Sequence, residues 1–133
     1  DAIKLANSNA RKNNISNCGF LQSNWFDNVP QETYQIIVSN PPYIDPKDHH
    51  LQLGDVRFEP NSALTAADSG LADLRHIIKT APNYLASNGA LMLEHGYDQS
   101  ASVLLMLKQA GFHNCQTFKD ISDNDRVSIG FLL

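Results

Sequence analysis

The quartet Asn40-Pro41-Pro42-Tyr43 combines residue types that can hold a small planar group. Adjacent prolines fix φ and have no N–H, so the backbone is stiff and its carbonyl oxygens lack a competing neighbour. The Asn40 side-chain carbonyl and the Pro41 backbone carbonyl can accept the two hydrogens of one –NH2 group. The Tyr43 ring can stack against the flat amide or base that carries this group. The quartet therefore predicts a site for a side-chain amide or an exocyclic amine.

Such a site would activate a weak nucleophile. An amide nitrogen attacks poorly because its lone pair is delocalised, and holding both hydrogens aims that lone pair at an electrophilic carbon in line with it. The nitrogen gains positive charge as it attacks, and two preorganised carbonyl dipoles would stabilise that charge. This interpretation requires no general base. The alternative is a proline-stiffened turn with a buried tyrosine.

The elements around the quartet predict where it lies. Residues 34–40 form a β-branched run, which is typical of a strand of a parallel sheet buried on both faces. Ligands of such sheets bind beyond the carboxyl ends of the strands. The segment DISDND, which joins the last two predicted strands, is too short for a parallel crossover. These two strands are therefore predicted to form an antiparallel hairpin at the edge of the sheet. The alternation of elements predicts an α/β fold with a mostly parallel sheet. Helices are expected at 1–14, from a cap at Asp68 or Ser69 to the terminator Asn88-Gly89 with a bend or split at Pro82, and at 99–111. The other strands are expected at 18–22, 90–95, 114–120 and 126–133.

The composition of the chain argues against several classes of function. The 133 residues carry a formal net charge of −4, and their ten Lys and Arg residues are thinly spread, which argues against direct nucleic-acid binding by this segment. No apolar run is long enough to cross a membrane. Cys18 and Cys115 are far apart, as in proteins of a reducing compartment, so a cytoplasmic location is expected. The five histidines show no metal-ligand spacing, so no metal site is expected.

Six segments together carry a resemblance to a known family: NWF (24–26), NPPYI (40–44), FEPNSALTAADSGLADLRHII (58–78), LASNGALMLEHG (85–96), AGF (110–112) and KDISDNDRV (119–127). In these segments the chain resembles the HemK/PrmC family of S-adenosylmethionine-dependent methyltransferases. The resemblance implies a Rossmann-like class I methyltransferase fold and methylation of a glutamine side-chain amide in class I peptide chain release factors. It spans most of the chain, so residues 1–133 are expected to be the C-terminal portion of the methyltransferase domain.

The resemblance also assigns roles to residues. Asn40 would contact both S-adenosylmethionine and the substrate amide, and Pro41, Pro42 and Tyr43 would line the glutamine pocket. Trp25 matches the family's contact to the adenine ring of the cofactor, although a core anchor explains it equally well. Glu59 would help to close the substrate site, unless it belongs to a surface turn. Asp120 and Arg126 are interpreted as an ion pair within the final hairpin, and His95 as a structural polar contact.

The family's main cofactor-binding elements are not recognisable here. The seven glycines form no GxG pattern, whereas the family holds its cofactor on a glycine-rich loop, where the backbone can approach the ligand closely. We therefore expect the fold to be partial, with the first strands, the glycine-rich loop and the release-factor docking module preceding Asp1. A sheet without those strands would have unpaired edges. The 133-residue chain alone is expected to be weakly folded or strand-swapped with a copy of itself, inactive, and a feeble cofactor binder.

Two other functions remain open from the sequence. One is methylation of an exocyclic amine of adenine or guanine in DNA or RNA, because the same quartet suits that substrate. The other is a non-catalytic fragment or partner-binding module that retains part of the fold.

Overall fold

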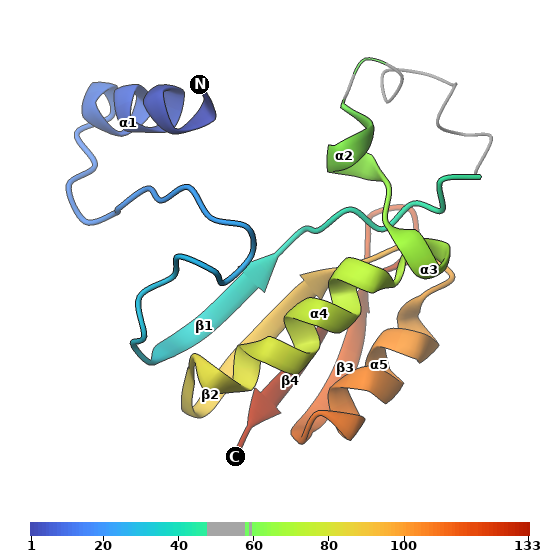
Figure 1. Cartoon of the computed structure of the whole chain (residues 1–133). Helices are drawn as coiled ribbons and strands as arrows, with labels where there is room; N and C mark the ends of the chain where they lie inside the picture. Colours follow the sequence, from blue (N-terminus) through green and yellow to red (C-terminus); the bar gives the residue numbers. More distant parts are fainter. Residues whose placement is uncertain (48–57, 59) are drawn as a thin grey trace. The chain divides into compact units, whose positions relative to one another are not determined.

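The computed structural model describes residues 1–47, 58 and 60–133, in two compact units, Asp1–Gln31 and Glu32–Leu133 (Figure 1). The first unit contains helix α1 (Ala2–Lys12), which ends at Asn13 as its sequence predicts. Turns and bends follow the helix, and the predicted strand at 18–22 is not formed. A strand exists only where a neighbouring strand accepts and donates its backbone hydrogen bonds, and no described strand pairs with these residues.

The second unit is built on a four-stranded sheet with the order β1-β2-β4-β3. Its strands are β1 (Tyr34–Ser39), β2 (Leu85–Glu94), β3 (Phe112–Lys119) and β4 (Asp125–Leu132). β1 pairs with β2 in parallel, whereas β2 with β4 and β3 with β4 pair antiparallel. The hairpin at the sheet edge is confirmed. The expectation of a mostly parallel sheet is wrong for this chain, because β4 inserts between β2 and β3 with reversed direction.

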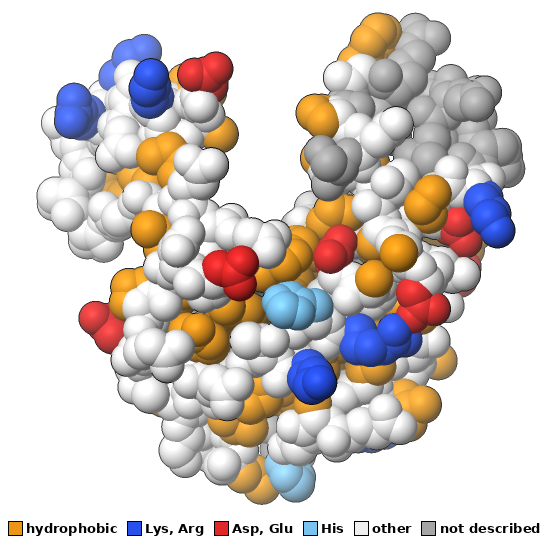
Figure 2. All heavy atoms as spheres, in the orientation of Figure 1, with side chains coloured by type: hydrophobic (Ala, Val, Ile, Leu, Met, Phe, Trp, Pro, Cys, Tyr) orange, Lys and Arg blue, Asp and Glu red, His pale blue; other side chains and the backbone are white. Residues whose placement is uncertain are grey.

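Two helices cover one face of this sheet, α4 (Ala72–Thr80) and α5 (Ser100–Gln109) (Figure 1). Their apolar stripes meet the residues of β2 that point to the same side, and the buried polar side chains among the described residues are His95, Gln99 and Ser128. Figure 2 shows the outer surface of this layer, where charged side chains lie among apolar ones. The core consists mainly of Leu74, Ile77 and Ile78 of α4, Val103 and Leu107 of α5, and Leu91 and Leu93 of β2.

The opposite face of the sheet is apolar and partly open. Side chains alternate along a strand, so Ile36 and Val38 of β1 point away from Leu91 and Leu93. Ile36 is 60% exposed and Val38 is 71% exposed. β1 is also an edge strand, with β2 as its one described neighbour. Within the described part of the chain, β1 thus pairs with β2 on one side only and carries two large, exposed apolar side chains.

The stretch from Asp68 to Gly89 differs from its prediction in two places, although the predicted split at Pro82 is present: α4 ends at Thr80, and a short 3-10 helix, η3 (Ala81–Asn83), follows before β2. Asn88 and Gly89 do not terminate a helix, because they lie inside β2 where the register with β1 shifts. The predicted cap is also wrong, since Asp68 lies in the one-turn helix α3 (Ala67–Gly70) with left-handed φ and pairs with Arg75 of α4.

None of the described helices has both the length and the apolar character that crossing a membrane requires. Across 1–47, 58 and 60–133, no three His, Cys, Asp or Glu side chains converge as metal ligands would.

Candidate active site

The quartet lies directly beyond the carboxyl end of β1, as its sequence predicts. Asn40 is exposed, Pro41 is buried, and Pro42 and Tyr43 are half-buried. All four line one cavity of about 280 Å³, together with Ile44, Ala63 and Leu64. The last two belong to helix α2 (Asn61–Leu64), so two segments far apart in sequence form the walls.

The first half of the quartet keeps its acceptors available. Within the part of the chain that the structure describes, no donor is hydrogen-bonded to the Asn40 side chain or to the Pro41 carbonyl oxygen. Asn40 lines the cavity while remaining exposed, so its amide is accessible from solvent. The predicted binding of an –NH2 group requires that the Asn40 side-chain oxygen and the Pro41 carbonyl oxygen can accept its hydrogens, and this geometry meets that requirement.

Tyr43, in contrast, is fixed at both ends. Its hydroxyl donates to Glu94 Oε1 at 2.9 Å, and its carbonyl oxygen accepts from Gln99 Nε2 at 3.0 Å. Burial raises the pKa of Tyr43, and the bond to the Glu94 carboxylate raises it further, so the phenol stays protonated and remains a donor. The ring is therefore held by the end of β2 while it lines the cavity.

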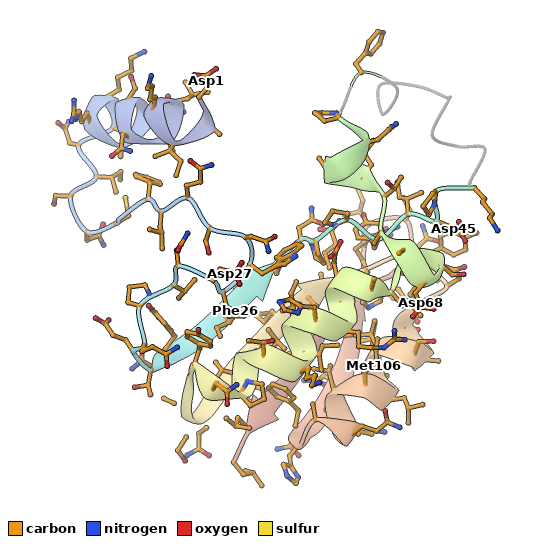
Figure 3. All side chains as sticks on the ribbon, in the orientation of Figure 1. Asp1, Phe26, Asp27, Asp45, Asp68 and Met106 are labelled. Carbon is orange, nitrogen blue, oxygen red and sulfur yellow. The ribbon has the colours of Figure 1, made fainter. Side chains whose placement is uncertain are left out.

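The chain after Tyr43 is tied to the segment that follows α2. Ile44 N–H donates to the Leu64 carbonyl at 3.0 Å, and Ala66 N–H donates to the Ile44 carbonyl at 3.1 Å. This pairing forms a short parallel bridge between Ile44 and Thr65. Asp45 and Asp68, on the two segments that the bridge joins, lie at the same end of the sheet (Figure 3). The quartet is thus supported on both sides by ordered backbone.

A second cavity, of about 350 Å³, lies against the same tyrosine. Tyr43 and Gln99 line it, with Arg126 and the acidic residues Asp45 and Asp98. Arg126 donates to Asp120 Oδ2 at 3.2 Å and to the His95 carbonyl at 3.1 Å, which confirms the predicted ion pair within the hairpin.

The Asp120 carboxylate of that ion pair also organises the turn between β3 and β4. The backbone N–H groups of Asn124 and Ser122 both donate to Asp120 Oδ1, and with Arg126 they hold the pKa of Asp120 below its usual range. The turn is thereby closed on a carboxylate that stays ionised.

His95 follows β2 and is fully buried. Its Nδ1 lies 2.8 Å from the Gly96 carbonyl, which can only accept, so Nδ1 carries the proton and Nε2 accepts from the Ser128 hydroxyl at 2.8 Å. Ser128 in turn accepts from Thr117 at 2.7 Å. Burial lowers the pKa of His95, in keeping with a neutral ring. The interpretation of His95 as a structural contact fits this geometry.

Of the other predicted site residues, one belongs to the other compact unit and one is not described. Trp25 lies in the 1–31 unit, half-buried in a turn with φ of 49°. Glu59 lies outside the described residues. Glu94 and Gln99, which contact Tyr43, were not predicted from the sequence, although the segment EHGYDQ (94–99) begins at the carboxyl end of β2, where ligand-facing residues of α/β sheets gather.

Comparison with known proteins shows which proteins the chain resembles. Residues 1–64 match the model of the family described as "Methyltransferase small domain". The chain is 53% identical over 131 residues to the release factor glutamine methyltransferase of Haemophilus influenzae and 51% identical over 130 residues to that of Escherichia coli. Both matches cover 98% of the chain. Along nearly its whole length the chain is thus similar to part of the release factor glutamine methyltransferases.

The chain spans less than half the length of these relatives of the release factor glutamine methyltransferase family, 44% and 47%. Its fold is that of class I methyltransferases: a methyltransferase from Pyrococcus furiosus superimposes with a TM-score of 0.63 at 17% identity, covering 97% of this chain and 56% of that structure. The predicted α/β, Rossmann-like fold is thereby confirmed as a partial one.

Proposed function

We propose that the protein containing this chain transfers a methyl group from S-adenosylmethionine to the side-chain amide nitrogen of a glutamine in a class I peptide chain release factor. The observation that carries the proposal is the single cavity that Asn40, Pro41, Pro42 and Tyr43 line at the end of β1. The names of the relatives support the substrate. Residues 1–133 would be the C-terminal portion of the methyltransferase domain, acting in the cytoplasm.

The cavity suits an amide group. The Asn40 Oδ1 and Pro41 carbonyl oxygens accept the two N–H hydrogens of the glutamine, which fixes the amide plane. Pro41 and Pro42 keep these acceptors in place because their φ angles cannot relax. When the nitrogen forms its bond to the methyl carbon, the bond from that carbon to sulfur would break and leave a neutral thioether, while the same two dipoles stabilise the positive charge on the nitrogen. The proton leaves the nitrogen to solvent after transfer, and no described side chain is required to remove it.

The described residues fit a cofactor only at its reactive end. Bound S-adenosylmethionine would supply a methyl group on a positively charged sulfur. Asn40 has an exposed amide oxygen beside the cavity and would face that end, and Trp25 would contact the adenine ring. The remaining contacts would come from parts of the protein outside this chain, which spans less than half the length of its relatives.

Substitution of Asn40 by alanine in the full-length protein tests the proposal. We expect methyl transfer to a purified release factor to fall at least a hundredfold, since one preorganised acceptor at the developing charge is lost. Folding should be nearly unchanged because Asn40 is exposed. The matched control is Asn83→Ala, an exposed asparagine in η3 that lines no described cavity of the site. Activity of Asn40→Ala at a tenth of normal or better would refute the assigned role.

The same assay separates the alternative functions. Transfer to DNA or ribosomal RNA in place of the release factor would identify an exocyclic-amine methyltransferase. Absence of transfer to any of these substrates by the full-length protein would favour a binding module.

A further inference from the structure

The side chain of Gln99 joins three segments around the quartet. Gln99 immediately precedes α5 and is only 8% exposed. Its Nε2 donates to the Tyr43 carbonyl at 3.0 Å and to the Ser69 carbonyl at 3.2 Å, and its Oε1 accepts from Gly96 N–H at 2.9 Å. Both amide hydrogens and the amide oxygen are therefore engaged with backbone groups of the quartet, of α3 and of the loop after β2.

The position of Gln99 invites a simpler interpretation, that of a helix cap. A capping side chain accepts from backbone N–H groups in the first turn of its own helix. Gln99 makes no such bond to α5. Its amide is directed backward to Gly96 and outward to the quartet, so these bonds do not serve the start of α5.

The Tyr43 carbonyl is also enclosed from the other side. A Cβ atom on Gly70 would lie 2.1 Å from Tyr43 O and 2.8 Å from Gln99 Nε2. The carbonyl thus lies between a bare glycine and the Gln99 amide, with no room to rotate. Because Pro41 and Pro42 fix the two φ angles before it, holding Tyr43 also limits where Asn40 can point.

We propose that Gln99 is a positioning residue that fixes the orientation of the Asn40-Pro-Pro-Tyr43 loop by binding the Tyr43 carbonyl. The inference rests on the proposed function of that loop. It assigns to Gln99 no contact with substrate or cofactor. Its effect on methyl transfer is transmitted through the loop backbone.

Two substitutions in the full-length protein test this role. Gln99→Met fills the same space without a donor, and we expect kcat to fall between tenfold and a hundredfold, since small displacements of a reacting group carry penalties of that size. The KM for S-adenosylmethionine should stay within about threefold. Gln109→Met, an exposed glutamine on the same helix, is the control and should be unchanged.

Gln99→Glu provides a readout that a purely structural role would not produce. An ionised glutamate would place a negative oxygen against two carbonyl oxygens, whereas the protonated acid again donates one hydrogen bond. We expect the kcat of Gln99→Glu, relative to the unchanged protein, to rise at least threefold from pH 8 to pH 6. The ratio for Gln99→Met should be constant over the same range. A ratio for Gln99→Glu that does not change with pH would overturn the proposal.

Hydrogen exchange tests the loop anchoring without relying on activity. In Gln99→Met, exchange should accelerate for the amides of Ile44 and Ala66, whose bonds close the bridge behind the quartet, and should not change within α5. Equal loosening of α5 would make Gln99 a helix-stabilising residue and would overturn the proposal. If the unchanged protein lacks release-factor methylation, the proposed function fails, while the exchange pattern still decides whether Gln99 holds the loop.

Discussion

At the scale of single residues, the first two residues of the quartet differ from Tyr43 in their hydrogen bonding. Asn40 and Pro41 keep their acceptors available, whereas Tyr43 is bonded at its hydroxyl and at its carbonyl. A rigid anchor next to two free oxygens is what preorganised binding of an amide requires. Gly70 is the residue that permits this arrangement, because any side chain there would occupy the place of the Tyr43 carbonyl.

Substitution of Gly70 by alanine should therefore be strongly destabilising. The new Cβ collides with Tyr43 O, and alanine is strained at the φ of 81°. We expect a loss of about 3 kcal/mol or more in the free energy of unfolding, measured with urea. Gly111→Ala separates the two causes: its φ is 90°, but no atom lies within 4 Å of its added Cβ. That control should lose only about 1 to 2 kcal/mol. Equal losses would show that the contact with Tyr43 contributes nothing.

At the scale of elements, a chain of hydrogen bonds crosses the sheet beneath the site. It runs from Thr117 on β3 through Ser128 on β4 to His95 after β2, and it ends on the Gly96 carbonyl. The geometry requires a neutral imidazole, since protonation of Nε2 would turn the acceptor of the Ser128 hydroxyl into a donor. The register of three strands is thus linked to one buried titratable ring.

Stability should consequently decrease in mild acid. The unfolded chain takes up a proton on His95 near its ordinary pKa of about 6.5, whereas burial lowers the pKa in the folded protein. The unfolded state then binds more protons below about pH 6.5, and the free energy of unfolding falls as the pH decreases through that window. We expect His95→Gln to reduce this slope between pH 7 and pH 5 and the exposed His76→Gln to leave it unchanged. An unaltered slope in His95→Gln would contradict the buried neutral ring.

The elements also show how far the sequence determines this structure. Apolar patterns located α1, α4, α5, β1 and the β3–β4 hairpin. α4 and α5 each bury one regular stripe, whereas α1 and β1 contain no fully buried residue, so the expected burial of β1 on both faces is wrong. It failed at 18–22, where an apolar run lacks a strand to pair with among the described residues. Residues 85–89 were missed as strand because Asn88 and Gly89 are turn formers, yet here they accommodate the register shift. The quartet was recognised from its residue types, but Gln99 was not, since its role depends on a contact across 56 positions.

At the scale of the whole chain, the exposed edge of the sheet is the feature that most affects behaviour. β1 has backbone groups available for a further strand and two largely exposed apolar side chains, Ile36 and Val38. Unprotected edges of this kind pair with other chains. We therefore propose that the 133-residue chain alone associates with copies of itself and lacks methyl-transfer activity.

Light scattering and calorimetry on the isolated chain test this proposal. We expect concentration-dependent oligomers, and no binding of S-adenosylmethionine at micromolar concentrations. Val38→Lys should reduce self-association because a charge at a sheet edge opposes strand pairing. Leu105→Lys removes an equally apolar exposed residue from α5 and should have little effect. A monomeric chain with micromolar affinity for the cofactor would refute the proposal.

The bridge between Ile44 and Thr65 has a further consequence for changes in chain length. Because these two residues are joined, a segment between them has its ends held together whatever its length. The entropy of closing a loop depends only weakly on its length, by about 0.6 kcal/mol for a doubling. Residues inserted or removed between the two ends would therefore change the stability little and would leave the quartet, which precedes the bridge, in its place.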